Sequence, residues 1–351
     1  MQMIRKWLAV GLILLFIGTA VISSNGQKIE EQFLLGSRGN ILYVGGSGPG
    51  NYTRIQDAID NASDGQTVFV YHSSTPYYEN IIIDKSIRLI GEDRNTTIID
   101  GNGLHNVTLI TADNVIISGL TLYHSGDYHL FGYMDSGVFI LSNGNTIDGN
   151  IIKRNLGCGI TARNSKNNTI RNNVIAKNAY YGAELINFTN NRFENNTISE
   201  SGLGIDVESG CENNISNNVF SDLDYSVSFN GCINNSIFHN KLNGHLHSVS
   251  MYYNSNNNVI SENTFDNEIE NVNNLWIVAS FNNAIVRNNF FTVGYTVCFA
   301  ASSNNVWDGN YWGHARLLPK VILGKNGQFD RYPNTLNFDW HPAHKPYDIG
   351  R

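Results

Sequence analysis

Three carboxylates and one arginine are the residues whose types and spacing in this sequence could support chemistry. Glu184, Asp206 and Glu208 occupy equivalent or neighbouring places in two short segments that follow one another in the chain, and Arg163 stands in the segment before them. Carboxylate oxygens are the ligands that Ca²⁺ prefers, and two carboxyl groups can act as general acid and base on a sugar. These four residues form the candidate catalytic group, and the alternative is a solvated acidic face.

Aromatic residues beside polar ones suit a second role, the stacking of sugar rings. Many of them fall in Tyr123–Asp135, an insertion that lengthens the interval of the repeat described below between Ile117 and Ile147. Insertions in repeat proteins map to loops on one face, so this loop could hold a ligand, or it could simply pack. The candidate ligand-binding residues are Tyr128, His129, Tyr133 and Tyr252.

Histidine and sulfur side chains raise the question of a transition metal. His245, His247 and Met251 lie close together in the sequence, and this combination of ligands could suggest copper. The spacing is weak evidence, so calcium at the three carboxylates is the better-supported ion and copper the less supported one.

The four cysteines indicate one cross-link. Cys211 and Cys232 take nearly equivalent places in adjacent repeats, so stacking would bring them within disulfide range in an exported protein. Cys158 and Cys298 lie several repeats apart and should not pair with each other. No C-x-x-C metal motif is present.

Short strands must position these residues. Segments such as Ile160–Asn164 and Ile205–Ser209 alternate apolar and polar residues, so alternate side chains point outward. The alternation predicts two outward columns. The first contains Thr161, Glu184, Asp206, Ser228 and Ser250, and the second contains Arg163, Ile186, Glu208, Asn230 and Tyr252.

The segments belong to an internal repeat. Asn167–Ile175 is one copy of a nine-residue unit, and its central apolar residue, Ile170, serves as an anchor. Asn stands two residues before and three residues after every anchor, and an apolar residue stands five after. Although the chain is rich in Asn, composition alone does not produce such columns, whereas a unit stacked at intervals of about 22 to 25 residues does. The other anchors are Ile147, Phe193, Ile215, Ile237, Ile260, Ile285 and Trp307.

The repeat predicts an all-β solenoid. Its apolar stretches are short, β-branched or aromatic, and broken by Asn, Gly and Ser, which is typical of short strands and tight turns. We therefore predict a single-stranded right-handed parallel β-helix, because crossovers between parallel strands are right-handed. The Asn columns suit corners, since Asn tolerates the left-handed backbone. Amides stacked at about 4.8 Å could also hydrogen-bond as ladders.

Both ends of a solenoid need covers. Thr53–Ala62 reads as a short amphipathic capping helix with Thr53 as its N-cap. Residues 313–351 break the repeat and contain most of the prolines, which indicates an irregular C-terminal cap. We expect the β-helix with its N-terminal cap to span residues 40–312.

The N-terminus predicts export. Arg5 and Lys6 precede the apolar run Trp7–Ile22, which is shorter than the roughly 20 residues of a spanning helix. Residues 1–24 therefore read as a cleaved signal peptide, with an uncleaved anchor as the alternative. The net charge of −7 comes with no basic stripe, so a nucleic-acid partner is not expected. Any membrane contact is expected only through this segment if it stays uncleaved.

The first turns resemble a known family. The segment Asn80–Gly101 reads NIIIDKSIRLIGEDRNTTIIDG and follows Ile55–Ile59, IQDAI. Together with the repeating Asn-Asn-x-Ile units, it is similar to NosD-like proteins of the pectin-lyase-like superfamily, across about residues 40–312. The resemblance implies a β-helix with carbohydrate-binding and sugar-hydrolysis relatives, among them lyases, hydrolases, epimerases and an accessory protein for copper-site assembly in a periplasmic reductase.

Three functions follow as expectations. The first is a secreted, periplasmic or cell-surface protein that binds polysaccharide or another cell-envelope component along its sheet. The second is a Ca²⁺-dependent lyase or a glycoside hydrolase, in which Glu184, Asp206, Glu208 and Arg163 would act. The paired Asp-Asp and Gly-His-Gly of hydrolases and the Asp-Pro-His of epimerases are missing, which weakens this case. The third is an accessory role in the maturation of a copper enzyme.

Overall fold

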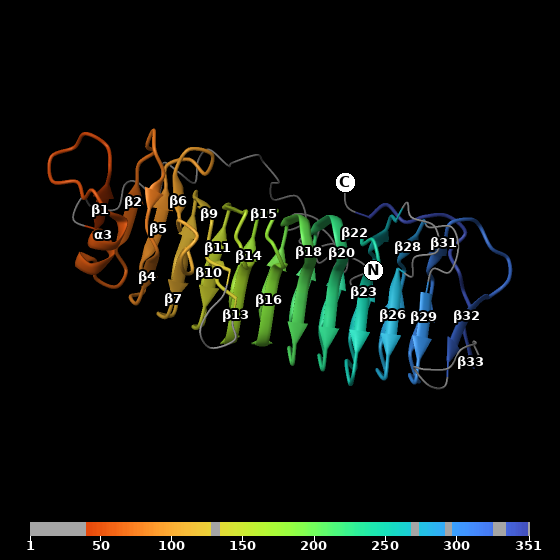
Figure 1. The fold of residues 1–351 in the computed structure, drawn as a ribbon. Helices are drawn as coiled ribbons and strands as arrows, with labels where there is room; N and C mark the ends of the chain where they lie inside the picture. Colours follow the sequence, from red (N-terminus) through yellow and green to blue (C-terminus); the bar gives the residue numbers. More distant parts are fainter. Residues whose placement is uncertain (1–39, 128–133, 268–273, 292–296, 326–334, 350–351) are drawn as a thin grey trace, which may run out of the picture. The chain divides into compact units, whose positions relative to one another are not determined.

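The computed structural model describes residues 40–349 except 128–133, 268–273, 292–296 and 326–334. Residues 41–351 form one compact unit, and the fold below is that of its described part. It is a right-handed parallel β-helix in which three strands alternate along the chain in each turn. Figure 1 shows the turns stacked side by side from β1 toward β29. Among the described residues, no helix has the length and apolar character needed to cross a bilayer.

One face of the solenoid is a 12-stranded parallel sheet. Its strands hold the anchor residues, and the register stacks every anchor on the next, from Ile147 on Ile170 to Ile285 on Trp307. The strands are β1 (Ile41–Val44), β2 (Thr67–Val70), β5 (Arg88–Gly91), β8 (Ile116–Ser118), β11 (Thr146–Asp148), β14 (Thr169–Arg171), β17 (Arg192–Glu194), β19 (Asn214–Ser216), β21 (Ser236–Phe238), β24 (Val259–Ser261), β27 (Ala284–Val286) and β30 (Val306–Asp308).

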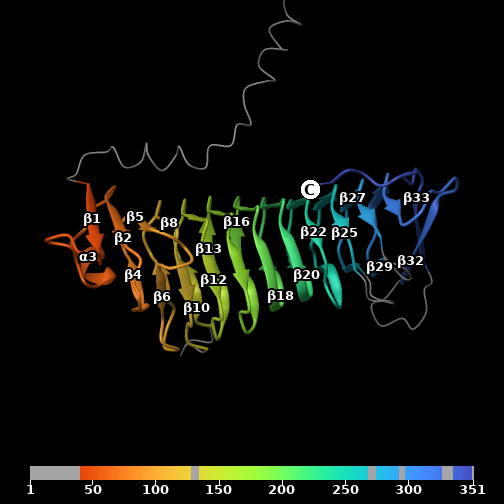
Figure 2. The same ribbon diagram turned by 90° about the horizontal axis from the view of Figure 1, so that it is seen from above.

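The second and third faces are joined into one 21-stranded sheet because two long strands run through both. These are β18 (Thr197–Glu208) and β20 (Val219–Asn230). The second face also contains β3 (Tyr77–Tyr78), β6 (Ile98–Asp100), β9 (Thr121–Tyr123), β12 (Ile151–Lys153), β15 (Val174–Ala176), β22 (Lys241–Leu242), β25 (Thr264–Phe265), β28 (Asn289–Phe290) and β31 (Tyr311–Trp312). The third contains β4 (Ile81–Ile83), β7 (Thr108–Ile110), β10 (Ser136–Ile140), β13 (Cys158–Lys166), β16 (Tyr181–Thr189), β23 (His247–Tyr252), β26 (Leu275–Val278), β29 (Val297–Ala300) and β32 (Lys320–Lys325), followed by β33 (Thr335–Asp339). Figure 2 shows the same stack from above.

The core is a set of stacked apolar columns. Every anchor from Ile147 to Trp307 is buried, and so are the residues five positions later, which end in Phe265, Phe290 and Trp312. These last three rings stack with centroids 4.5 Å and 4.6 Å apart. Each buried apolar side chain contributes roughly 1.5 to 3 kcal/mol, so the columns supply much of the stability.

Two amide ladders run along the stack, as the Asn columns predicted. Asn173 donates its backbone N–H and a side-chain N–H to Oδ1 of Asn196, at 3.0 Å each. Asn196 repeats both bonds to Asn218, at 2.8 Å and 3.1 Å. The second ladder, from Asn145 through Asn168, is built in the same way. Each ladder amide therefore satisfies a buried backbone donor of the preceding turn, which unpaired would cost about 1–3 kcal/mol.

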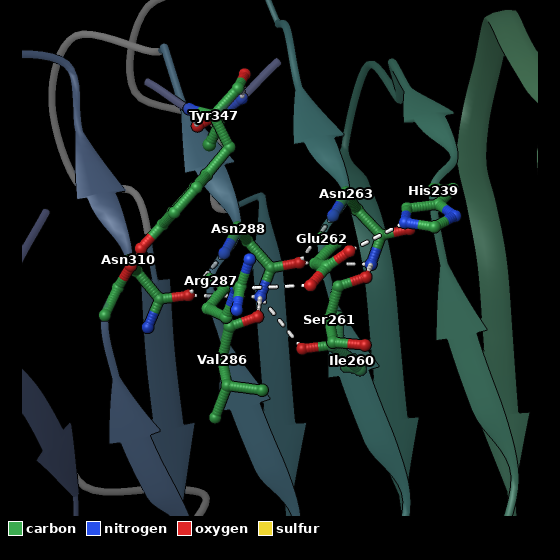
Figure 3. A network of polar contacts seen from close by, with 12 residues as sticks. His239, Ile260, Ser261, Glu262, Asn263, Val286, Arg287, Asn288, Asn310 and Tyr347 are labelled. Atoms are coloured by element: carbon green, nitrogen blue, oxygen red, sulfur yellow. Dashed lines mark hydrogen bonds and ion pairs between the residues drawn. The ribbon is translucent and has the colours of Figure 1, made fainter. Parts of the chain in front are cut away.

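The left-handed corners lie one residue before each ladder, which corrects the prediction. The residue two after each anchor has a positive φ, for example Asn195 at 56°, whereas ladder residue Asn196 does not. In three successive turns this corner is His239, Glu262 and Arg287. Glu262 bonds His239 Nε2 at 2.7 Å and Arg287 Nε at 3.1 Å (Figure 3). The pairing therefore links three left-handed corners at residues other than Gly and Asn.

The N-terminal cover is α3 (Ile55–Asn61), which buries Ile55, Ala58 and Ile59 as expected. Its N-cap residue is Arg54, so the prediction of Thr53 was wrong, and the Arg54 side chain makes no capping bond. Glu79 takes this role from a distance, because its carboxylate accepts the N–H groups of Ile55 and Gln56 at 2.7 Å and 2.9 Å. A carboxylate at this helix end satisfies two orphan donors.

A carboxylate also ends the ladder of Asn173 and Asn196 at the C-terminal end of the stack. Asp339, at the end of β33, accepts the backbone N–H of Asn310 at 2.9 Å and its side-chain N–H at 3.1 Å. It also accepts the N–H groups of Gly309 and of the Trp312 indole. The antiparallel hairpin β32–β33 thus supplies the acceptor that a further turn would have supplied.

Candidate functional site

The outward residues of the third face fall into the two columns expected from the sequence. The register places Thr161, Glu184, Asp206, Ser228 and Ser250 side by side in consecutive turns. It places Arg163, Ile186, Glu208, Asn230 and Tyr252 in the second column. Since neighbouring strands lie about 4.8 Å apart, Glu184 and Asp206 are next-turn neighbours. We call the outward face of β13, β16, β18, β20, β23 and β26 the long-strand face.

Glu184 is held by Arg163. The guanidinium Nη2 lies 3.0 Å from Glu184 Oε2, and the two side chains are only 14% and 17% exposed. An ion pair shielded to this degree is screened less than a surface pair. The pair therefore fixes one carboxylate on the long-strand face in a defined position.

Asp206 lies in a different environment one turn away. Burial raises the pKa of Asp206 above its usual range, a hydrogen bond with Ser228 opposes the shift, and the negative charges of Glu184 and Glu208 add to it. Asp206, whose pKa is raised, thus adjoins a carboxylate that is paired with an arginine. Two carboxyl groups in such unlike environments are the arrangement from which general acid and partner roles arise.

Aromatic side chains continue this surface toward the C-terminal turns. Tyr225 and His247 are register partners with ring centroids 5.4 Å apart. His247 stacks on Trp276 at 5.5 Å with an interplanar angle of 15°. Trp276 follows Ser250 in the column that contains Asp206. We call Tyr225, His247 and Trp276 the aromatic run.

Two further tyrosines border the cluster. The pKa of Tyr181 is raised by burial and by the charges of Asp206 and Glu184, so its phenol adjoins both carboxyl groups. Burial and the neighbouring Tyr225 raise the pKa of Tyr252 to about 12. Tyr252, a predicted ligand-binding residue, therefore lies on the same face as the acidic cluster.

Sequence reasoning missed Tyr181 and the aromatic run, although a signal was present. Tyr181, Tyr225 and His247 each stand three residues before the first outward column, with Leu203 between them in register. Each strand starts before its alternating segment does, so a prediction from the alternating segments leaves out the residues at the start of the strands. The other predicted ligand residues, Tyr128, His129 and Tyr133, lie outside the described residues.

The predicted disulfide does not form in the structure, where Cys211 and Cys232 are free cysteines. Cys211 pairs with Ile233 and not with Cys232. A one-residue offset in a strand turns a side chain to the other face. The Cys211 thiol accordingly contacts Thr189 at 3.3 Å, whereas the Cys232 thiol is buried and donates to Val207 O at 3.1 Å.

The predicted copper ligands do not converge either. Met251 is a fully buried core residue, whereas His247 belongs to the outward aromatic run. His245, which precedes the strand, is exposed.

Residues 59–252 match the family model described as Periplasmic copper-binding protein (NosD). The chain belongs to the NosD family. No curated protein matches it in sequence.

Solved structures share the β-helix. The A-module of the Azotobacter vinelandii mannuronan C-5 epimerase AlgE6 superposes with a TM-score of 0.60 at 17% identity, over 77% of this chain and 82% of that one. DFA-IIIase from Arthrobacter chlorophenolicus A6 gives 0.57 at 14% identity, over 88% and 93%. At these identities the likeness establishes the fold and leaves the chemistry open.

The donor set of this NosD-family chain does not fit the copper of the family description. Within the described ranges, no group of three or more His, Cys, Asp or Glu side chains is arranged to hold a metal. Cys158 and Cys232 are buried core residues, and within the described ranges neither belongs to a cluster of metal-ligating side chains. The calcium site expected from Glu184, Asp206 and Glu208 is likewise not formed by these side chains.

Proposed function

We propose that this NosD-family protein binds an extended carbohydrate along the long-strand face. The observation that carries the proposal is the continuity of the aromatic run with the acidic cluster, on strands in strict register. Sugar rings have an apolar face and a hydroxylated edge. Tyr225 and Trp276 offer flat rings, and the carboxylates offer hydrogen-bond acceptors.

The charge of the face selects a neutral glycan. Glu184, Asp206 and Glu208 outnumber Arg163, the cation that pairs with Glu184, so a polyuronate would meet like charges, which cost binding energy. A chain of neutral sugars meets no such repulsion. Because the turns are evenly spaced, successive sugars would make similar contacts along the face. We therefore expect neutral polysaccharides to bind better than alginate or pectate.

The place of action follows from export. The apolar segment of residues 7–22 after Arg5 and Lys6 supports secretion across a membrane, and the family description is periplasmic. We propose that the protein meets its carbohydrate in the cell envelope or outside it.

Binding to a panel of soluble polysaccharides by affinity electrophoresis tests the proposal. Trp276→Ala should lower the affinity for the bound glycan about tenfold, since an aromatic contact contributes about 0.5–1.5 kcal/mol beyond its area. Trp340→Ala is the matched control, because Trp340 is 62% exposed on the C-terminal cap. Equal binding by both variants, or no binding to any neutral glycan, would reject the proposal.

Hydrolysis of the bound glycan is a second candidate, which the raised pKa of Asp206 favours. The Asp206 carboxyl would give its proton to the glycosidic oxygen as the bond to the anomeric carbon breaks. Glu184 would form an ester with that carbon, and water would then cleave the ester and return a proton to Asp206. Adjacent strands are about 4.8 Å apart, close to the roughly 5–5.5 Å between carboxyl groups in retaining enzymes.

Paired variants separate hydrolysis from binding. Asp206→Asn should abolish release of reducing sugar while glycan retention persists. Asp224→Asn, which changes an exposed carboxylate on β20, should alter neither. Turnover that survives in Asp206→Asn would eliminate the catalytic assignment but leave the binding proposal standing.

A further inference from the structure

The C-terminal end of the solenoid exposes an apolar surface. Leu317 and Leu318 are 94% and 77% exposed in the loop before β32, and Trp340 is 62% exposed just after β33. Val321 and Leu336 in the hairpin are also exposed. We call these five residues the cap patch. Terminal caps of repeat proteins ordinarily present a polar outer face, so such a surface indicates contact with a partner.

The register gathers the hairpin part of the patch on one side. Val321 pairs with Phe338, and the alternate pair is Leu323 with Leu336, so these side chains share a face. Ile322, between them, points to the other face and is buried. Trp340 stacks on Phe338 at 4.9 Å. Figure 1 shows β32 and β33 at the end of the stack, beyond β29.

Positive charge adjoins the patch. Residues 313–351 contain more Lys and Arg than Asp and Glu, whereas residues 40–312 have the reverse balance. Arg316 and Lys320 flank the two leucines, and neither is among the ion pairs of the described residues. The pKa of Lys320 is lowered by burial and by the charge of Arg316, so the two cations adjoin each other. Lys320 Nζ also lies over the Trp312 ring, 5.6 Å from its centroid. Within the described part of the chain, Arg316 Nε is a buried donor without a hydrogen-bond partner.

We propose that the cap patch docks on an anionic phospholipid bilayer, with Leu317, Leu318 and Trp340 in the interface and Arg316 and Lys320 against lipid phosphates. Exposed leucines beside tryptophan and basic residues have the composition of an interfacial anchor. A phosphate beside the two side chains would offset the repulsion between the two cations. This contact is independent of the N-terminal apolar segment and of the carbohydrate proposal.

Quenching of tryptophan fluorescence by brominated lipid tests the docking. The full-length protein is mixed with phosphatidylcholine vesicles that contain brominated phosphatidylglycerol as the minor lipid, and the signal of Trp340→Phe is subtracted, which cancels the other tryptophans. The Trp340 component should be quenched, and Leu317→Ser with Leu318→Ser should weaken its apparent affinity at least tenfold. Arg316→Gln should weaken it several-fold. Leu104→Ser, at a 55% exposed position in an early turn, is the matched control.

The outcomes distinguish the partners. Loss of quenching at high salt, and little quenching by vesicles of brominated phosphatidylcholine alone, support an anionic bilayer. An unquenched Trp340 would overturn the proposal. A dimer in sedimentation that Leu317→Ser and Leu318→Ser dissociate, without any response to vesicles, would instead assign the patch to a second copy of the chain.

Discussion

The amide ladders yield the sharpest test of the fold. Asn196 is 1% exposed, and its Oδ1 accepts two N–H groups of Asn173, each at 3.0 Å. Its own Nδ2 donates to Ile170 O at 2.9 Å and to Asn218 Oδ1 at 3.1 Å. Asn196→Ala removes the shared acceptor, and the two donors of Asn173 lose their partner in the interior of the stack.

The magnitude follows from those two donors. A buried donor left unpaired costs about 1–3 kcal/mol, so Asn196→Ala should lower the free energy of unfolding by about 2–6 kcal/mol. Natural domains have only about 5–15 kcal/mol in total, so this single change removes a large share. The cavity left by the amide adds to the loss.

Urea unfolding, followed by circular dichroism and by tryptophan fluorescence, measures the difference. Thr197→Ala is the control, because Thr197 is the next residue but is exposed to solvent, and surface changes usually stay within about 0.5 kcal/mol. The two probes must give coincident transitions before a free energy is assigned, since long repeat arrays can unfold in steps. A cost within about 1 kcal/mol of that of Thr197→Ala would refute the claim that the ladder supports the stack.

Three further changes test other parts of the structure. Asp339→Ala should destabilise the C-terminal turns by at least about 3 kcal/mol, seen as early loss of protection in hydrogen exchange, because five donors lose their acceptor and three of these bonds are buried. The raised pKa of Asp206 means that the folded state holds its proton more tightly than the unfolded chain. Ionisation therefore costs stability as the pH rises above the unfolded value near 3.8, and Asp206→Asn should raise the melting temperature at neutral pH but not in acid below that value. Iodoacetamide should label Cys211 well before Cys232, whose burial raises the pKa of its thiol to about 12; a crosslinked peptide pair in non-reducing mass spectrometry would contradict the register.

The ladders could be predicted from the sequence, but the left-handed corners were placed wrongly, and the reason is local. Ladder and corner residues are adjacent, as in Asn172-Asn173 and Asn195-Asn196, so in these turns both columns are Asn. Later turns separate them, because the corner becomes His239, then Glu262, then Arg287, while the ladder stays Asn. A ladder needs both a carbonyl acceptor and an N–H donor, which only an amide supplies at this length. A corner position requires only a residue that can adopt the left-handed backbone.

The disulfide prediction failed through a difference of one residue that the sequence contains. The step from Cys211 to Cys232 is one residue shorter than the step between the anchors of the same two turns, Ile215 and Ile237, which are register partners. In a strand, one residue decides the face. The outward columns were predicted correctly because each was counted from its own alternating strand. The position of Trp276 in the first column was not predicted, because Trp276 lies in the longest interval between the later anchors. The spacing of the earlier turns does not apply there.

The extent of the family match bears on where a shared function can lie. Residues 59–252 contain the acidic cluster and Tyr252 but end before Trp276 and the cap patch. Within the matched region, Cys158, Cys232 and Met251 are buried core residues, and the half-buried Cys211 thiol contacts Thr189. The outward side chains of the same region form an acid cluster beside aromatic rings. For this reason we propose a carbohydrate and not a soft metal ion as the ligand of the long-strand face, whose outward groups are hydrogen-bond acceptors and flat rings.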